Sequence, residues 1–119
     1  DGTRIAYLSD GDTLEIYSLE TKAVQSSVKV AIDLSNKVEI PFGWIFDGQK
    51  IVLLAGRSGS QDLQVFSQKL IPEKQIDFPV SPVNVPVMVC LDKVALVQIL
   101  PGPQLWRINF QTESWKKLY

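Results

Sequence analysis

The chain repeats one stretch of sequence three times, and this repeat constrains the fold more than any other feature. The first copy covers residues 1–24, and it returns at residues 47–70 and, more loosely, at residues 92–118. Each copy has an apolar β-rich run, a short polar or Gly/Pro turn, a second run that alternates apolar and polar residues, and a charged or amide-rich tail. Beyond a possible single turn, no stretch shows the 3.6-residue period of a helix. The repeat therefore predicts an all-β chain.

The length of the repeat predicts how many strands each copy holds. Runs that we expect to be buried on both faces start at Ile5, Ile51 and Ala95, which gives steps of 46 and 44 residues. A step in the mid-forties that carries four short strands is typical of a propeller blade, whereas leucine-rich, ankyrin and tetratricopeptide repeats are shorter. We therefore expect one partial β-propeller domain over residues 1–119, with about 2.5–3 four-stranded antiparallel blades. Its blade units would lie at about 1–35, 38–78 and 87–119.

The strands can be placed within these units from their turns. Asp1-Gly2 has the composition of a tight hairpin turn, so the first unit would begin at its second strand. The inner strands of the later units are expected at 51–54 and 95–99, and residues 72–74 are expected to form a turn before a strand at 75–78. About eleven strands result.

A proline-rich segment separates the second and third units. Residues 79–86 read PVSPVNVP, and three prolines at this spacing favour extended backbone and exclude a central sheet strand. We interpret the segment as a connector between units. The alternative is a PxxP ligand for a proline-recognising domain.

The alternation of side chains predicts the core and the faces that remain open. Ten side chains are expected to be mostly buried: Ile5, Tyr7, Ile16, Trp44, Ile51, Leu53, Val65, Val97, Leu105 and Ile108. The terminal blades would each leave an apolar face open, built from Tyr7, Leu14, Val97 and Trp106. The aromatic residues Tyr17, Phe66 and Trp106 lie near equivalent places and are interpreted as packing between blades, with a ligand platform as the alternative.

These residues resemble a known group of repeats, the WD-repeat-like blade of TolB-type β-propellers. The first unit carries this resemblance in Asp1-Gly2, Ile5-Ala6-Tyr7, Ile16-Tyr17 and Glu20-Thr21, the second in Trp44, Asp47-Gly48 and Ile51, and the third in Leu105-Trp106-Arg107-Ile108 and Thr112. The second unit has Ile45-Phe46 where the group has Ser-Pro, and the third has lost the Asp-Gly turn. The resemblance implies a binding scaffold or the accessory propeller of a larger enzyme, and a periplasmic or extracytoplasmic location.

Composition excludes several classes of function. Twelve basic and thirteen acidic residues are mixed along the chain, and the net charge is −1, so we expect no nucleic-acid partner. The longest apolar runs are far shorter than the roughly 20 residues of a membrane helix, so no membrane span is expected. Histidine is absent, which removes Ser-His-Asp and Cys-His catalysis and most zinc sites. We expect no catalytic, cofactor-binding or metal-binding residue, and therefore no enzyme and no cofactor.

Four features carry weaker signals for chemistry. Cys90 is the single cysteine and is interpreted as a buried structural thiol that has no disulfide partner within the chain. Asp10 and Asp12 are interpreted as a turn rather than a calcium loop, because the remaining ligands of such a loop are missing. Residues 56–60, GRSGS, are interpreted as a hairpin loop rather than a phosphate loop or nucleophile elbow. The last feature is a set of cations beside tryptophans. We interpret it as a solvated outer strand, with a cation–aromatic surface as the alternative, and its residues are Trp106, Arg107, Trp115, Lys116 and Lys117.

Two functions are compatible with this pattern. The first is a non-catalytic propeller segment that acts as a protein-interaction scaffold. The alternative is an accessory gating propeller of a larger enzyme, such as a prolyl-oligopeptidase-type peptidase. In either case we expect partners to cover the terminal blades. The partner could be the remaining blades of a parent chain, a different protein, or a second copy that completes a six-blade ring. We favour the parent chain, because the sequence begins inside a turn.

Overall fold

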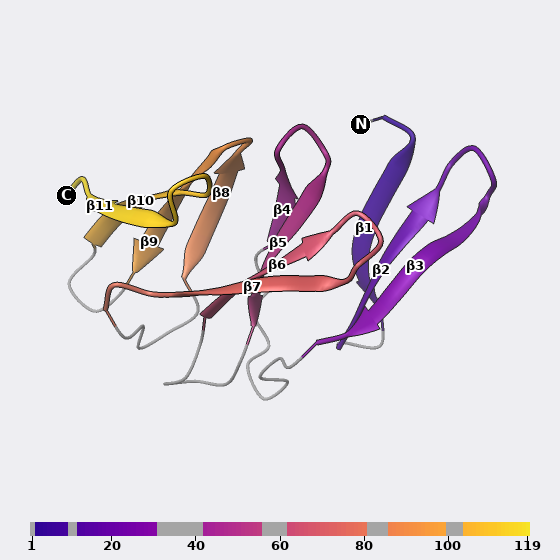
Figure 1. The fold of residues 1–119 in the computed structure, drawn as a ribbon, viewed down its shortest axis with the longest axis horizontal. Helices are drawn as coiled ribbons and strands as arrows, with labels where there is room; N and C mark the ends of the chain where they lie inside the picture. Colours follow the sequence, from indigo (N-terminus) through magenta and orange to yellow (C-terminus); the bar gives the residue numbers. More distant parts are fainter. Residues whose placement is uncertain (1, 10–11, 31–41, 56–61, 81–85, 100–103) are drawn as a thin grey trace.

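The computed structural model describes residues 2–9, 12–30, 42–55, 62–80, 86–99 and 104–119, and these residues form eleven β-strands and no helix (Figure 1). The strands are β1 (Arg4–Ser9), β2 (Thr13–Ser18), β3 (Ala23–Lys29), β4 (Phe42–Ile45), β5 (Lys50–Ala55), β6 (Asp62–Ser67), β7 (Pro72–Asp77), β8 (Val87–Leu91), β9 (Val94–Ile99), β10 (Gln104–Asn109) and β11 (Ser114–Lys117). The prediction of an all-β chain is confirmed.

The strands pair with their neighbours in sequence to form three antiparallel sheets. The first sheet has the order β1-β2-β3, the second β4-β5-β6-β7, and the third β8-β9-β10-β11. The expected inner strands, β5 and β9, lie inside their sheets as predicted. Figure 1 shows the three sheets side by side along the longest axis of the molecule.

Equivalent turns show that the three sheets are copies of one unit. The strands β2, β6 and β10 each end in a residue whose side-chain oxygen accepts backbone N–H bonds of 2.9–3.2 Å from two to four residues further on. These capping residues are Ser18, Ser67 and Asn109. Each turn also holds one non-glycine residue with positive φ, and these are Lys22, Leu70 and Glu113. Counting back from the capping residues therefore aligns the strands position by position.

The sheets pack face to face through two separate clusters of buried residues. The contact between the first and second sheets contains Leu14, Ile16, Ile51, Leu53, Phe66 and Leu70, and Val30 joins it after β3. The contact between the second and third sheets contains Ile45, Val52, Leu54, Leu63, Val65, Ile76, Ala95, Val97, Ile99, Ile108 and Phe110. The second sheet is thus apolar on both faces, as a sheet between two others must be.

The first strands of the second and third sheets are joined directly. Ile45 of β4 forms a parallel bridge with Asp92, and the Phe46 N–H donates to the Asp92 carbonyl oxygen over 3.3 Å. The Asp92 carboxylate also accepts from the Asp47 N–H. Phe46, Asp47 and Asp92 all have positive φ, so this contact holds backbone that non-glycine residues seldom adopt. No pattern in the sequence indicated that Asp92 would bridge two units.

Several expectations about burial were wrong, and strand parity explains them. Ile5 is 49 % exposed, because it lies on the face of β1 that has no sheet packed against it. Leu14 was expected on an open terminal face, and Val97 was assigned both to such a face and to the core. Both residues are buried in the contacts between sheets. Trp106 packs against the contact between the second and third sheets as well. Successive side chains of a strand point to opposite faces, so a shift of one residue exchanges the buried and open sets.

The other expected core residues divide into two groups. Ile16, Ile51, Leu53, Val65, Val97 and Ile108 are buried as predicted, whereas Tyr7, Trp44 and Leu105 are only half-buried. The expected turn at 72–74 is also wrong, because β7 already begins at Pro72. This strand is the outer edge of its sheet, where a residue without an N–H group can be accommodated. Residues 81–85 of the proposed connector lie outside the described residues.

Candidate interaction surface

Within the described part of the chain, the two end sheets each present a face that no other sheet covers. Cross-strand partners share a face, so the registers identify the members of each. The outer face of the first sheet contains Ile5, Tyr7, Ser9, Thr13, Glu15, Tyr17, Val24, Ser27 and Lys29. The outer face of the third sheet contains Val87, Val89, Leu91, Val94, Leu96, Gln98, Leu105, Arg107, Asn109, Ser114 and Lys116.

The outer face of the third sheet is strongly apolar along β8. Val87, Val89 and Leu91 are 60 %, 52 % and 53 % exposed, although they alternate with half-buried residues on the other face. Leu96 and Leu105 of the neighbouring strands are half-buried. From the sequence we predicted an open apolar face on this terminal blade but assigned Val97 and Trp106 to it, and both lie on the opposite face. The alternation along 87–91 was a signal that could have found the correct residues.

Two cations lie side by side on this face. Arg107 of β10 is the cross-strand partner of Lys116 of β11, and both are exposed. Neither forms an ion pair with another described residue. Like charges directly opposite each other destabilise a sheet. A carboxylate placed over the pair would relieve this repulsion.

The outer face of the first sheet carries an acid whose carboxylate accepts hydrogen bonds from two hydroxyl groups. The Tyr7 hydroxyl donates to Glu15 Oε2 over 2.6 Å, and the Ser9 hydroxyl donates to Glu15 Oε1 over 2.9 Å. The hydrogen bond to Glu15 raises the pKa of Tyr7 above its ordinary value. Ile5 and Val24, at 49 % and 50 % exposure, supply the apolar part of the face.

Two grooves lie where neighbouring sheets meet. The groove between the first and second sheets has a volume of about 260 Å³ and is lined by Arg4, Gln25, Ser26, Gln68 and Lys69. The groove between the second and third sheets has a volume of about 200 Å³ and is lined by Phe46, Lys50, Val65, Lys74, Ile76, Phe110 and Gln111. Arg4 and Lys50 hold equivalent positions, opposite the capping residues of their sheets. The two grooves are therefore copies of one feature of the repeat.

Three of the four cations that line these grooves, Arg4, Lys50 and Lys74, have partners within the protein. Arg4 lies 5.0 Å from the centre of the Trp44 ring and donates to Gln68 Oε1 over 2.8 Å. Lys50 forms an ion pair of 2.9 Å with Glu73, and Lys74 forms one of 3.5 Å with Glu113. These contacts tie neighbouring strands and sheets together, so we assign the grooves a role in packing.

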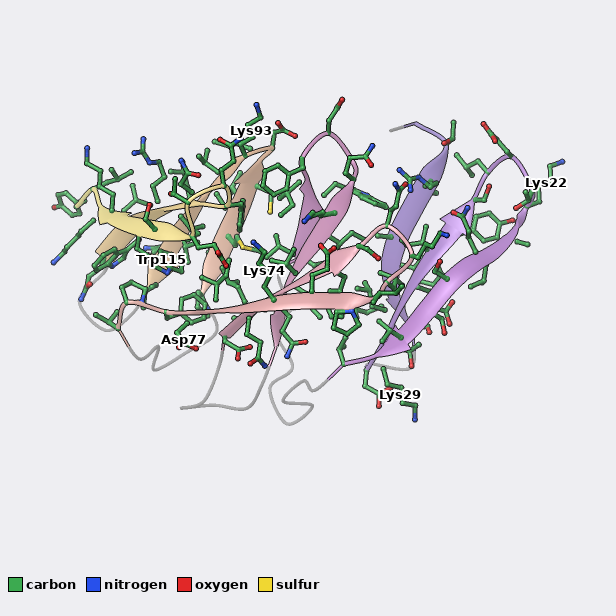
Figure 2. All side chains as sticks on the ribbon, in the orientation of Figure 1. Lys22, Lys29, Lys74, Asp77, Lys93 and Trp115 are labelled. Atoms are coloured by element: carbon green, nitrogen blue, oxygen red, sulfur yellow. The ribbon has the colours of Figure 1, made fainter. Side chains whose placement is uncertain are left out.

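The cation–aromatic surface suggested by the sequence is not assembled around Trp106 and Arg107. These two residues point to opposite faces of β10, because they are adjacent in a strand. Trp106 instead packs edge-on against Trp115, with ring centres 6.4 Å apart. Trp115 lies beside β7, where its Nε1 donates to the Asp77 carbonyl oxygen over 2.9 Å (Figure 2). The tryptophans therefore serve the contact between the second and third sheets.

The remaining candidates from the sequence are only partly described. Asp10 and residues 56–60 lie outside the described residues, and Asp12 accepts a hydrogen bond of 2.8 Å from Val30 through its carbonyl oxygen. Cys90 is half-buried, and burial raises the pKa of its thiol to about 11. Among the described residues, no group of three His, Cys, Asp or Glu side chains is placed to hold a metal ion. The same ranges contain no helix long and apolar enough to cross a membrane.

No protein-family model matches the sequence, and no curated protein matches it. The two outer faces are therefore the basis on which a function can be assigned.

Proposed function

We propose that this chain is a segment of a β-propeller and acts as a non-catalytic scaffold for protein interaction. Three features support the proposal: the strand order within each sheet, the face-to-face packing of consecutive sheets, and the direct contact between the first strands β4 and β8. A propeller repeats four-stranded sheets around a central channel, and its first strands lie nearest to that channel.

The observation that carries the interaction role is the apolar character of the outer faces. Val87, Val89 and Leu91 each expose more than half of their surface in one row of β8. Soluble monomers seldom expose large contiguous apolar patches, and such patches usually mark a contact with another protein surface. The equivalent positions of β4 that the structure describes, Gly43 and Ile45, lie against the third sheet. The outer faces therefore have the composition of surfaces that bind a further sheet, either of a parent chain or of a protein partner.

Dye binding and light scattering of the 119-residue chain test this proposal. We expect the chain either to bind a hydrophobic dye in its folded state or to associate, because one of the two must follow from exposed outer faces. Replacing Val89 by Ser should weaken dye binding or association, while Lys93→Ser, at the turn between β8 and β9, should leave both unchanged (Figure 2). A monomer that binds no dye would contradict the proposal.

A further inference from the structure

We propose that the outer face of the third sheet binds the outer face of the first sheet in a second copy of this chain, with Arg107 and Lys116 of one copy against Glu15 of the next. The inference rests on the proposed function, and it names the partner that the outer faces bind.

Arg107 occupies a position of the repeat that is buried in the other two sheets. Counted back from the capping residues, Arg107 is equivalent to Ile16 of β2 and Val65 of β6. Both of those residues are buried in contacts between sheets. The third sheet thus has a packing face of the same construction, in which a guanidinium replaces an aliphatic side chain. Its partner must supply an acceptor at this point.

The two outer faces carry opposite charges near their centres. Arg107 and Lys116 form an adjacent pair of cations without an acidic partner among the described residues. Glu15 holds its carboxylate in a fixed position on the other outer face through the hydroxyls of Tyr7 and Ser9. The cation of that face, Lys29, lies opposite Thr13 at the far end of β2. The centres of the two faces are therefore complementary in charge.

The direction of stacking favours a head-to-tail contact. The first sheet packs on the second, and the second on the third, always in the same sense along the chain. A second copy placed head to tail continues this order, because its β2 then lies over β10 as β6 does over β2. Such a contact also covers apolar side chains on both sides, Leu96 and Leu105 on one face and Ile5 with Val24 on the other. Two copies bring together six sheets, within the four to eight blades of closed propellers.

The experiment is a pair of charge reversals measured by sedimentation at protein concentrations up to about 100 μM, where micromolar association is visible. The wild-type chain should self-associate, and added salt should weaken the association. Arg107→Glu and Glu15→Arg should each weaken it by about tenfold or more, because either change places like charges together. An equimolar mixture of the two variants should recover association, since the carboxylate introduced at position 107 of one chain then meets the guanidinium introduced at position 15 of the other. Circular dichroism confirms that both variants remain folded.

The controls are Lys93→Glu and Glu20→Arg, which make comparable changes of charge at exposed turn residues outside both faces. Neither should alter the association. Association that the charge reversals leave unchanged would overturn the inference, and so would folded variants whose mixture does not recover association. A wild-type monomer that binds hydrophobic dye would also overturn it while leaving the proposed function standing, because the faces would then be open to a different protein. A monomer that binds no dye would overturn both.

Discussion

Gly43 of β4 lies so close to Cys90 of β8 that a Cβ atom at position 43 would stand 2.7 Å from Cys90 Sγ. The contact joins the first strands of the second and third sheets, beside the bridge between Ile45 and Asp92. A glycine is required here because of close approach between two strands.

The first prediction concerns this contact. Gly43→Ala should lower the free energy of unfolding by about 1–3 kcal/mol, because the added methyl group overpacks the contact between β4 and β8. Denaturant titration measures the change. Adding Cys90→Ala removes Sγ and leaves the Cys90 Cβ contact, 3.0 Å from the new Cβ, so the penalty in the double variant should shrink without vanishing. Equal penalties with and without the sulfur would show that the two residues do not meet.

The second prediction concerns the reactivity of Cys90. Burial raises the pKa of its thiol from 9.0 to about 11, so the reactive thiolate should be about a hundredfold rarer at pH 8 than for an ordinary thiol. Alkylation of the folded chain should therefore be slow, and it should accelerate in denaturant. Mass spectrometry follows the modification with time. Equally fast reaction in both states would place Cys90 on an open surface.

The third prediction compares two isoleucines at equivalent positions, Ile5 in β1 and Ile51 in β5. Ile51 is fully buried, and Ile51→Ala should destabilise the fold by about 2–5 kcal/mol. Ile5 is 49 % exposed in a single chain, and in protein dilute enough to stay monomeric Ile5→Ala should change stability by no more than about 0.5 kcal/mol. Thermal or denaturant unfolding of both variants provides the comparison. Similar losses would mean that the first sheet is covered on both faces.

The fourth prediction concerns a pair of acids on neighbouring strands. Asp62 of β6 is the cross-strand partner of Asp77 of β7, and Asp62 Oδ1 is buried without a hydrogen-bond partner. Desolvation by burial and then the charge of Asp77 raise the pKa of Asp62 above 3.8. The ionised carboxylate is thus unfavourable in the folded state. As pH falls from neutral through the raised pKa towards 3.8, this protonation should stabilise the fold, because the folded state takes up the proton first.

Asp62→Asn tests this directly. The variant should be more stable than the wild type at neutral pH by about 0.2–1 kcal/mol, the usual range for a cross-strand charge pair. The difference should shrink as the solution is acidified. Glu20→Gln, which removes one negative charge from an exposed turn, should show no such pH-dependent gain. A gain that is constant with pH would refute the role of ionisation.

Much of the architecture follows from local sequence. Three features of the sequence sufficed: the alternation of apolar and polar side chains, the turn residues, and the repeat length in the mid-forties. They predicted the strands, the antiparallel pairing of neighbouring strands, and the inner strands of two sheets. These features depend on residues close together in the chain. The beginning of β7 at Pro72 was missed because the tolerance of a strand for proline depends on whether it lies at an edge.

Only the tertiary structure decided which face of each strand is buried and where the candidate surface lies. Ile5 and Ile51 hold the same position in the repeat, yet one is half exposed and the other fully buried, because only the second has a sheet packed over it. Arg107 and Lys116 are nine residues apart in sequence, and their pairing follows from the register of β10 and β11. Likewise, the contact of Asp92 with Phe46 depends on how two sheets are stacked. Strand formation is local, whereas burial and charge pairing are set by whatever packs on the strand from elsewhere in the fold.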